Sequence, residues 1–258
     1  NLYNIMLNDS FVKCGLILFV SFLFGLSACQ NTIEEFDSSY EGTAYFPLAV
    51  GNTWIYQLDS VIYDNNGLKV DSSSLQIKET ITESYIDDAG DEVFRVQRAR
   101  RNAETSPWFT TDIWTASKTQ RKAYRVEENL RFAKLNFPVV EGKSWDGNAY
   151  IDENVIVKIG GEPIRIFKNW GNYRYSSVGI SEQLNGQFYD SVCLVEQVDI
   201  EDKISKRFAI EKYALGFGLI YKEMTILDTQ KFDSNDPWVK KAEQGFILKQ
   251  SLISFNPG

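Results

Sequence analysis

Carboxylates are the side chains of this sequence with the widest catalytic potential. The chain has 35 acidic residues and no histidine, so a Ser-His-Asp triad and a His-ligated zinc site are both excluded. Two convergent carboxylates could still hydrolyse a glycosidic bond at a separation of about 5 Å or of about 6.5 to 9.5 Å. Eight candidates lie in or beside expected strands: Glu83, Asp112, Asp146, Asp152, Glu153, Glu182, Glu196 and Glu211. Their spacing singles out no pair. We therefore predict no catalytic residue, and a carboxylate-dependent glycan hydrolase stays an alternative.

Two acidic segments offer hard oxygen ligands of the kind that calcium prefers. Residues 87–92 and 228–236 are rich in Asp, but neither follows the twelve-residue loop that ends in a bidentate glutamate. Asp, Asn and Gly are also the residues that tight turns require for backbone reasons. We therefore expect turns in both segments, and we predict neither a metal site nor a cofactor.

The amino-terminal segment carries a processing signal. An apolar run over residues 15–26 leads into Leu26-Ser27-Ala28-Cys29, which resembles the lipobox of a bacterial lipoprotein. The run has about a dozen residues, whereas a membrane-spanning helix needs roughly 20, so a cleaved signal is favoured over an anchor helix. The resemblance implies a signal peptide over residues 1–28 and a diacylglyceryl group on the thiol of Cys29.

The same resemblance implies a location at the outer membrane, reached through the lipid anchor. Residues 29–44 are polar and acidic, as expected of a flexible tether. Glu34 and Glu35 are similar to the acidic signal that sends Bacteroidota lipoproteins to the cell surface. A solvated linker on the periplasmic face is the alternative.

Cys193 is the one thiol expected in the folded domain, because Cys14 would leave with the signal peptide and Cys29 would be acylated. It lies in the apolar run of residues 191–195, where a cysteine behaves as a small hydrophobic residue. A catalytic cysteine needs a nearby base, and the chain has no histidine to supply one. We expect Cys193 in the core.

A group of aromatic and basic residues is the best candidate for a contact surface. Trp170, Tyr173, Arg174 and Tyr175 surround an expected turn, and these three residue types are enriched at interface hot spots. The group would suit an envelope protein or a glycan partner; the alternative is that these strand ends pack on their neighbours. The net charge of −8 argues against a nucleic-acid partner, which needs a concentrated basic surface.

A second aromatic pair depends on strand alternation. Trp108 and Trp114 fall on one face of an expected strand if side chains alternate without interruption along it. Aromatic residues make up 14% of the chain, which would suit a carbohydrate platform or an apolar cavity.

A nine-residue pattern occurs twice, at residues 46–54 and again at residues 137–145. Both copies read Phe-Pro-apolar-x-x-Gly-x-hydroxyl-Trp. Pro fixes φ and Gly permits positive φ, so each copy predicts a tight turn. We expect Trp54 and Trp145 in the core, and two similar halves over residues 45–136 and 137–258. Independent turns of similar sequence are the alternative.

Alternating apolar and polar residues predict an all-β domain over residues 45–258. A short helix is expected over residues 236–245, with Asp236 as N-cap, Pro237 at the first helical position and Gly245 beyond the end. The expected strands cover residues 54–63, 75–81, 93–99, 108–116, 120–126, 130–135, 155–159, 164–170, 173–180, 188–198, 207–214, 219–227 and 246–255.

Three segments, residues 46–54, 186–195 and 213–220, together resemble Bacteroidota outer-membrane lipoproteins without an assigned function. More distantly, they resemble periplasmic proteins in which an antiparallel sheet curls into a half-barrel. The resemblance implies antiparallel meander sheets in a curled, barrel-like domain. It also implies a lipid-anchored binding or accessory module of the cell envelope without catalytic activity. A carrier that holds an apolar ligand in the concavity of the half-barrel is the alternative within the binding class.

Overall fold

The structure is a computed structural model that describes residues 42–159 and 161–258. These residues belong to one compact unit, Ser38–Gly258. The predicted signal peptide, Cys29 and nearly all of the predicted tether lie outside the described residues. Within the described part of the chain, no helix is long and apolar enough to cross a membrane.

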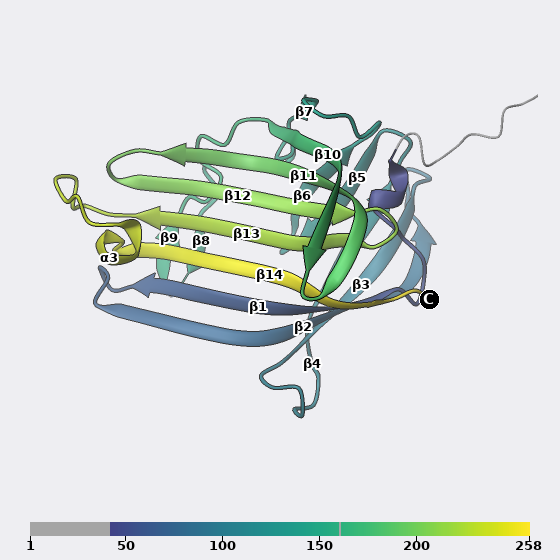
Figure 1. Cartoon of the computed structure of the whole chain (residues 1–258), viewed down its shortest axis with the longest axis horizontal. Helices are drawn as coiled ribbons and strands as arrows, with labels where there is room; N and C mark the ends of the chain where they lie inside the picture. Colours follow the sequence, from purple (N-terminus) through teal and green to yellow (C-terminus); the bar gives the residue numbers. More distant parts are fainter. Residues whose placement is uncertain (1–41, 160) are drawn as a thin grey trace, which may run out of the picture. The chain divides into compact units, whose positions relative to one another are not determined.

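Twelve antiparallel strands form one sheet, in the order β6-β5-β4-β3-β2-β1-β14-β13-β12-β11-β10-β7 (Figure 1). The last strand of the chain, β14, lies between β1 and β13 and joins the two meanders into a single sheet. The strands of the sheet are β1 (Thr53–Asp64), β2 (Lys69–Ile86), β3 (Glu92–Arg101), β4 (Phe109–Lys118), β5 (Lys122–Glu127), β6 (Leu130–Asn136), β7 (Ser144–Trp145), β10 (Tyr173–Leu184), β11 (Gln187–Glu201), β12 (Ser205–Ala214), β13 (Gly218–Asp228) and β14 (Gln244–Asn256).

Three shorter elements complete the described fold. A 3₁₀ turn, η2 (Thr43–Tyr45), precedes the sheet, and a two-stranded ribbon pairs β8 (Val157–Ile159) with β9 (Glu162–Ile164). A single turn of helix, α3 (Trp238–Lys241), precedes β14.

The sheet curls until its two ends nearly meet, which gives a nearly closed barrel. The backbone N–H of Ala133 in edge strand β6 donates to the carbonyl of Gly147, just after edge strand β7, at 2.9 Å. The hydroxyl of Tyr175 in β10 accepts from the N–H of Asn136 in β6 at 2.9 Å. These bonds cover part of both edges, which would otherwise expose unpaired backbone groups.

The all-β prediction is confirmed, and most expected strands appear within a few residues of their predicted ends. The hairpin expected after β1 is formed by residues 64–69, where Asn65 and Asn66 both have positive φ. The predicted strand over residues 164–170 is wrong beyond Ile164. Ile166 and Phe167 are neighbours in sequence and both are buried, which an alternating strand does not allow.

The predicted helix exists but is shorter. Its N-cap is Pro237 with ψ of 151°, so the helix starts one residue later than expected, at Trp238. Gly245 does not follow the helix end but lies in β14 with φ of +121°. A Cβ at this position would collide with the carbonyl of Ile226, so glycine is required by the close approach of β13.

The two copies of the nine-residue pattern form similar turns at their glycines, although the Phe137–Pro138 peptide bond is cis and the Phe46–Pro47 bond is not. The N–H of Gly51 donates to the carbonyl of Ile81 at 2.8 Å, and the N–H of Gly142 donates to that of Tyr175 at 2.8 Å. Both glycines have positive φ, as predicted. The larger proposal, of two similar halves, stays a prediction. The strands that follow the two turns differ in length, since β1 has twelve residues and β7 has two.

The tryptophans that end these turns are both buried, as predicted. The indole N–H of Trp54 donates to the carbonyl of Phe217 at 2.6 Å. That of Trp145 donates to the carbonyl of Ala133 at 2.8 Å. Each indole therefore contributes both apolar burial and a hydrogen bond to a distant segment.

Candidate functional site

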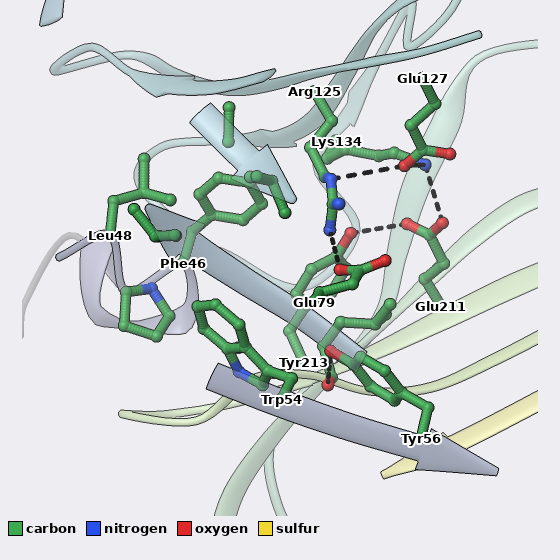
Figure 2. Close-up of a pocket in the computed structure, with 16 residues that line it drawn as sticks. Phe46, Leu48, Trp54, Tyr56, Glu79, Arg125, Glu127, Lys134, Glu211 and Tyr213 are labelled. Atoms are coloured by element: carbon green, nitrogen blue, oxygen red, sulfur yellow. Dashed lines mark hydrogen bonds and ion pairs between the residues drawn. The ribbon is translucent and has the colours of Figure 1, made fainter. Parts of the chain in front are cut away.

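Charged side chains from both meanders meet inside the barrel (Figure 2). Lys134 of β6 lies 2.9 Å from a carboxylate oxygen of Glu211 in β12 and 3.5 Å from one of Glu127 in β5. Lys222 of β13 lies 3.7 Å from each of the same two carboxylates. We call these four residues, together with Arg98, Arg125 and Glu79, the charged layer.

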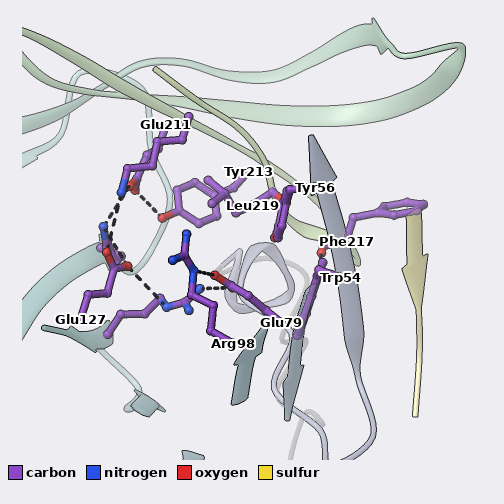
Figure 3. Close-up of polar contacts among 12 residues, drawn as sticks. Trp54, Tyr56, Glu79, Arg98, Glu127, Glu211, Tyr213, Phe217 and Leu219 are labelled. Carbon is purple, nitrogen blue, oxygen red and sulfur yellow. Dashed lines mark hydrogen bonds and ion pairs between the residues drawn. The ribbon is translucent and has the colours of Figure 1, made fainter. Parts of the chain in front are cut away.

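The rest of the charged layer continues toward β2 and β3 (Figure 3). Arg125 of β5 donates to Glu79 of β2 at 2.9 Å, and the Nε of Arg98 in β3 lies 3.6 Å from the same carboxylate. Arg125 also lies 3.5 Å from Glu127. The indole of Trp114 lies close to both guanidinium groups, with its ring centroid 4.5 Å from Arg98 and 5.3 Å from Arg125.

Two carboxylates of the charged layer, Glu127 and Glu211, are held ionised. Burial opposes the charge on Glu127, but Lys134, Lys222 and the two arginines outweigh it and lower the pKa of Glu127 below its ordinary value. Burial also opposes the charge on Glu211, and Lys134 and Lys222 lower its pKa in the same way. A general acid needs the opposite shift, so neither residue is suited to protonate a leaving group.

An open apolar cavity of about 350 Å³ lies beside the charged layer. Its polar border includes Glu127, Lys134 and Lys222. Its apolar lining comes from β1, β6, β8, β13, β14 and the segment after β9, and consists of Leu58, Ile62, Leu130, Phe132, Val157, Ile159, Ile166, Phe167, Trp170, Met224, Phe246 and Leu248.

A smaller cavity of about 40 Å³ lies beside the same layer and shares Glu127 and Lys134 with the larger one. Figure 2 shows it between the charged side chains and the first turn, where Phe46, Leu48 and Trp54 form its apolar border. A volume of this size holds one or a few waters and is too small for an organic ligand. Of the two cavities that adjoin the charged layer, the larger one is therefore the candidate ligand site.

Two donors at the larger cavity have no partner. The indole N–H of Trp170 and the amide Nε2 of Gln197 are both buried, and neither finds an acceptor among the described residues. Both residues line the cavity. Their nitrogen atoms have almost no accessible surface, so these two N–H groups do not face the cavity itself.

Two solved structures resemble the chain distantly. One is a protein from Parabacteroides distasonis that is named as a lipoprotein, with 12% sequence identity and a TM-score of 0.41. The match covers 82% of this chain and 98% of that chain. The other is a domain from Vibrio parahaemolyticus named for outer-membrane lipoprotein sorting; it is 11% identical, the match covers 83% and 88%, and the TM-score is 0.20. Likenesses at these TM-scores assign neither a family nor a function. No protein-family model matches the sequence, and no curated protein matches it either.

The four residues predicted as an exposed contact surface do not form one. Tyr173 and Tyr175 point inward from β10 and are only 1% and 0% exposed. Trp170 is half-buried at the cavity, and Arg174 points outward, 52% exposed, to an ion pair with Glu196 at 3.1 Å. Alternation along β10 separates Arg174 from its two tyrosine neighbours, so the prediction of a single exposed surface is corrected. Part of the predicted group, Trp170 and Tyr173, lines the cavity instead.

The predicted pairing of Trp108 and Trp114 on one face is wrong. The register of β3 and β4 shifts between Arg98 and Ala99, and this bulge reverses the alternation between the two tryptophans. The ring of Trp108 consequently lies near Lys78 and Arg101, away from the barrel interior.

Most of the eight candidate carboxylates serve structural roles. Asp146 and Asp152 accept backbone hydrogen bonds within turns, and Glu153 is exposed. Glu211 is the one that joins the charged layer. The others form ion pairs: Glu83 with Arg95, Asp112 with Arg98, Glu182 with Lys212, and Glu196 with Arg174.

The acidic turn that begins at Asp87 and the residue Cys193 have the structural roles expected from the sequence. The carboxylate of Asp87 accepts from the N–H groups of Ala89 and Asp91, which is a turn function. No group of three or more Cys, Asp or Glu side chains suited to a metal occurs among the described residues. Cys193 is fully buried, and burial raises the pKa of its thiol, so it is a core residue.

Proposed function

We propose that this protein is a lipid-anchored module of the cell envelope that holds an apolar ligand in the cavity of its barrel. The observation that supports this proposal is the apolar cavity of about 350 Å³ beside the charged layer. Small-molecule sites are concave, largely apolar and about 300 to 1,000 Å³ in volume, with a few polar groups that fix orientation. The cavity has all of these properties.

The energetic cost of leaving the cavity empty supports a binding role for it. Protein interiors are packed with few voids, and side chains that line an open space lose dispersion contacts. Wall residues that are only partly buried, such as Met224 and Leu248, also remain in contact with water when the cavity is empty. A hydrocarbon ligand would remove both costs.

The anchor and the envelope location rest on the sequence. The lipobox-like segment that ends at Cys29 supports export and acylation, and its residues lie outside the described part. An outer-membrane anchor would keep the barrel near a source of apolar molecules. The glycan-hydrolase alternative is less well supported, because the interior carboxylates Glu127 and Glu211 are held ionised by their cationic neighbours.

The test is to fill the cavity from one strand of the sheet. Met224 of β13 lines the cavity, and its neighbour Thr225 lies on the outer face. We expect Met224→Trp to weaken binding of 1-dodecanol at least tenfold, because loss of two buried methylene groups costs about 1.6 kcal/mol. Thr225→Trp is the matched control and should bind as the wild type does.

Native mass spectrometry of the full chain in a non-ionic detergent measures the bound fraction directly. The added mass of dodecanol distinguishes the bound ligand from covalent acylation. If the wild type retains no dodecanol, or if Met224→Trp retains as much as Thr225→Trp, the cavity is not the binding site and the proposal fails.

A further inference from the structure

We propose that the cavity selects a single-chain amphiphile with an anionic head group, whose acidic oxygens bind Lys222 while the chain lies against the apolar wall. This inference rests on the proposed function and adds the ligand class. It is carried by three features: the ammonium group of Lys222, which makes no hydrogen bond to any described residue, the apolar wall beside it, and the volume of the cavity.

The ammonium group of Lys222 is available to a ligand. Its two ion-pair partners, Glu127 and Glu211, are each 3.7 Å away, and Lys222 donates no hydrogen bond to any of the described residues. Each of these carboxylates also has Lys134 as a second partner, at 3.5 and 2.9 Å. Lys222 therefore borders the cavity with three N–H donors and no short contact. A head group with acceptor oxygens matches the three N–H donors of Lys222, whereas a cationic head group offers no acceptor.

The size of the cavity limits the ligand to one chain. A volume of about 350 Å³ is near the lower end of the range for small-molecule sites. The two acyl chains of a membrane phospholipid would need far more space. A fatty acid or a single-chain alkyl phosphate has the required combination of a short hydrocarbon and an anionic head group.

Four probes with the same twelve-carbon chain test the inference on the full chain by native mass spectrometry. They are laurate, dodecyl phosphate, 1-dodecanol and dodecyltrimethylammonium. We expect laurate or dodecyl phosphate to bind at least tenfold more tightly than dodecanol, because hydrogen bonds to charged groups are the stronger ones. The relative affinities of laurate and dodecyl phosphate then distinguish a carboxylate head group from a phosphate head group.

Lys222→Met removes the charge and keeps most of the length of the side chain. We expect it to reduce the affinity for the anionic probe at least tenfold more than the affinity for dodecanol, so that the preference disappears. The control is Lys249→Met, which removes an outward lysine of β14 that pairs with Glu223 and is 54% exposed; its preference should match the wild type. Lys222→Gln, which removes the same charge and keeps a polar side chain, repeats the test if Lys222→Met does not fold.

The outcomes separate the two proposals. If no probe binds, the proposed function itself fails. If dodecanol binds as tightly as both anionic probes, or if the anionic preference survives the loss of the charge at Lys222, ligand binding stands and the head-group inference is overturned.

Discussion

Lys134 donates to Glu211 at 2.9 Å across the interior of the barrel and joins β6 of the first meander to β12 of the second. The two residues are 77 positions apart in the chain and are 3% and 1% exposed. The hydroxyl of Tyr213 donates to the other oxygen of Glu211 at 2.6 Å. The pair thus links edge strand β6 to β12 across the interior; Lys134 borders both cavities and Glu211 borders the smaller one.

Removing one partner of this pair should destabilise the protein strongly. We expect Lys134→Met to lower the free energy of unfolding by about 3 to 5 kcal/mol, because it leaves Glu211 with a buried, less compensated charge. Lys249→Met, which breaks an exposed pair with Glu223, should cost at most about 1 kcal/mol. Urea unfolding followed by tryptophan fluorescence measures both. Equal losses in the two variants would contradict a structural role for the interior pair.

Stability should fall at acid pH because of the same carboxylates. The pKa values of Glu127 and Glu211 are lowered in the folded state. Their contribution is therefore present above the ordinary glutamate pKa and is lost as pH falls toward the folded values. Urea unfolding between about pH 7 and pH 3 should show a decline that begins near the ordinary glutamate pKa of about 4.3. Glu127→Gln should have a shallower decline, and an unchanged slope would reject this assignment.

The two turn tryptophans should each be essential to stability. Trp54→Ala and Trp145→Ala remove a buried indole and its hydrogen bond, and we expect each to cost about 3 to 5 kcal/mol. Trp54→Phe and Trp145→Phe keep most of the apolar volume and should cost less. Denaturant unfolding gives all four values. Losses below about 1 kcal/mol for both alanine variants would show that the turns do not anchor the sheet.

Acylation at Cys29 should retain the protein at the membrane. We expect Cys29→Ala to be recovered in the soluble fraction without acyl mass. The variant lacks the thiol that would carry the lipid, and stable anchoring depends on buried acyl chains. Intact-mass spectrometry and membrane fractionation check both parts. Cys193→Ala is the control and should remain acylated, since Cys193 is buried in the core. A membrane-bound mature chain without acyl mass would contradict the lipobox assignment.

Local sequence patterns were sufficient for the β class and for most strand positions. Alternation and turn residues act over a few positions, so they identify elements such as β1 and its hairpin with Asn65 and Asn66. They also placed Trp54, Trp145 and Cys193 in the core. Part of the charged layer could be predicted from the sequence in the same way. Glu79 alternates with Ile77 and Ile81 on a face that is otherwise apolar, which marks it as an inward charge.

Contacts between distant strands decided the site. One bulge in the pairing of β3 with β4 separates Trp108 from Trp114. The insertion of β14 between β1 and β13 and the near-closure of the sheet bring β5, β6, β12 and β13 together at the charged layer. The sequence alone determined which residues alternate and where the chain turns. Only the tertiary structure decided which inward charges meet, because their partners lie as far as 95 residues away along the chain, as between Glu127 and Lys222.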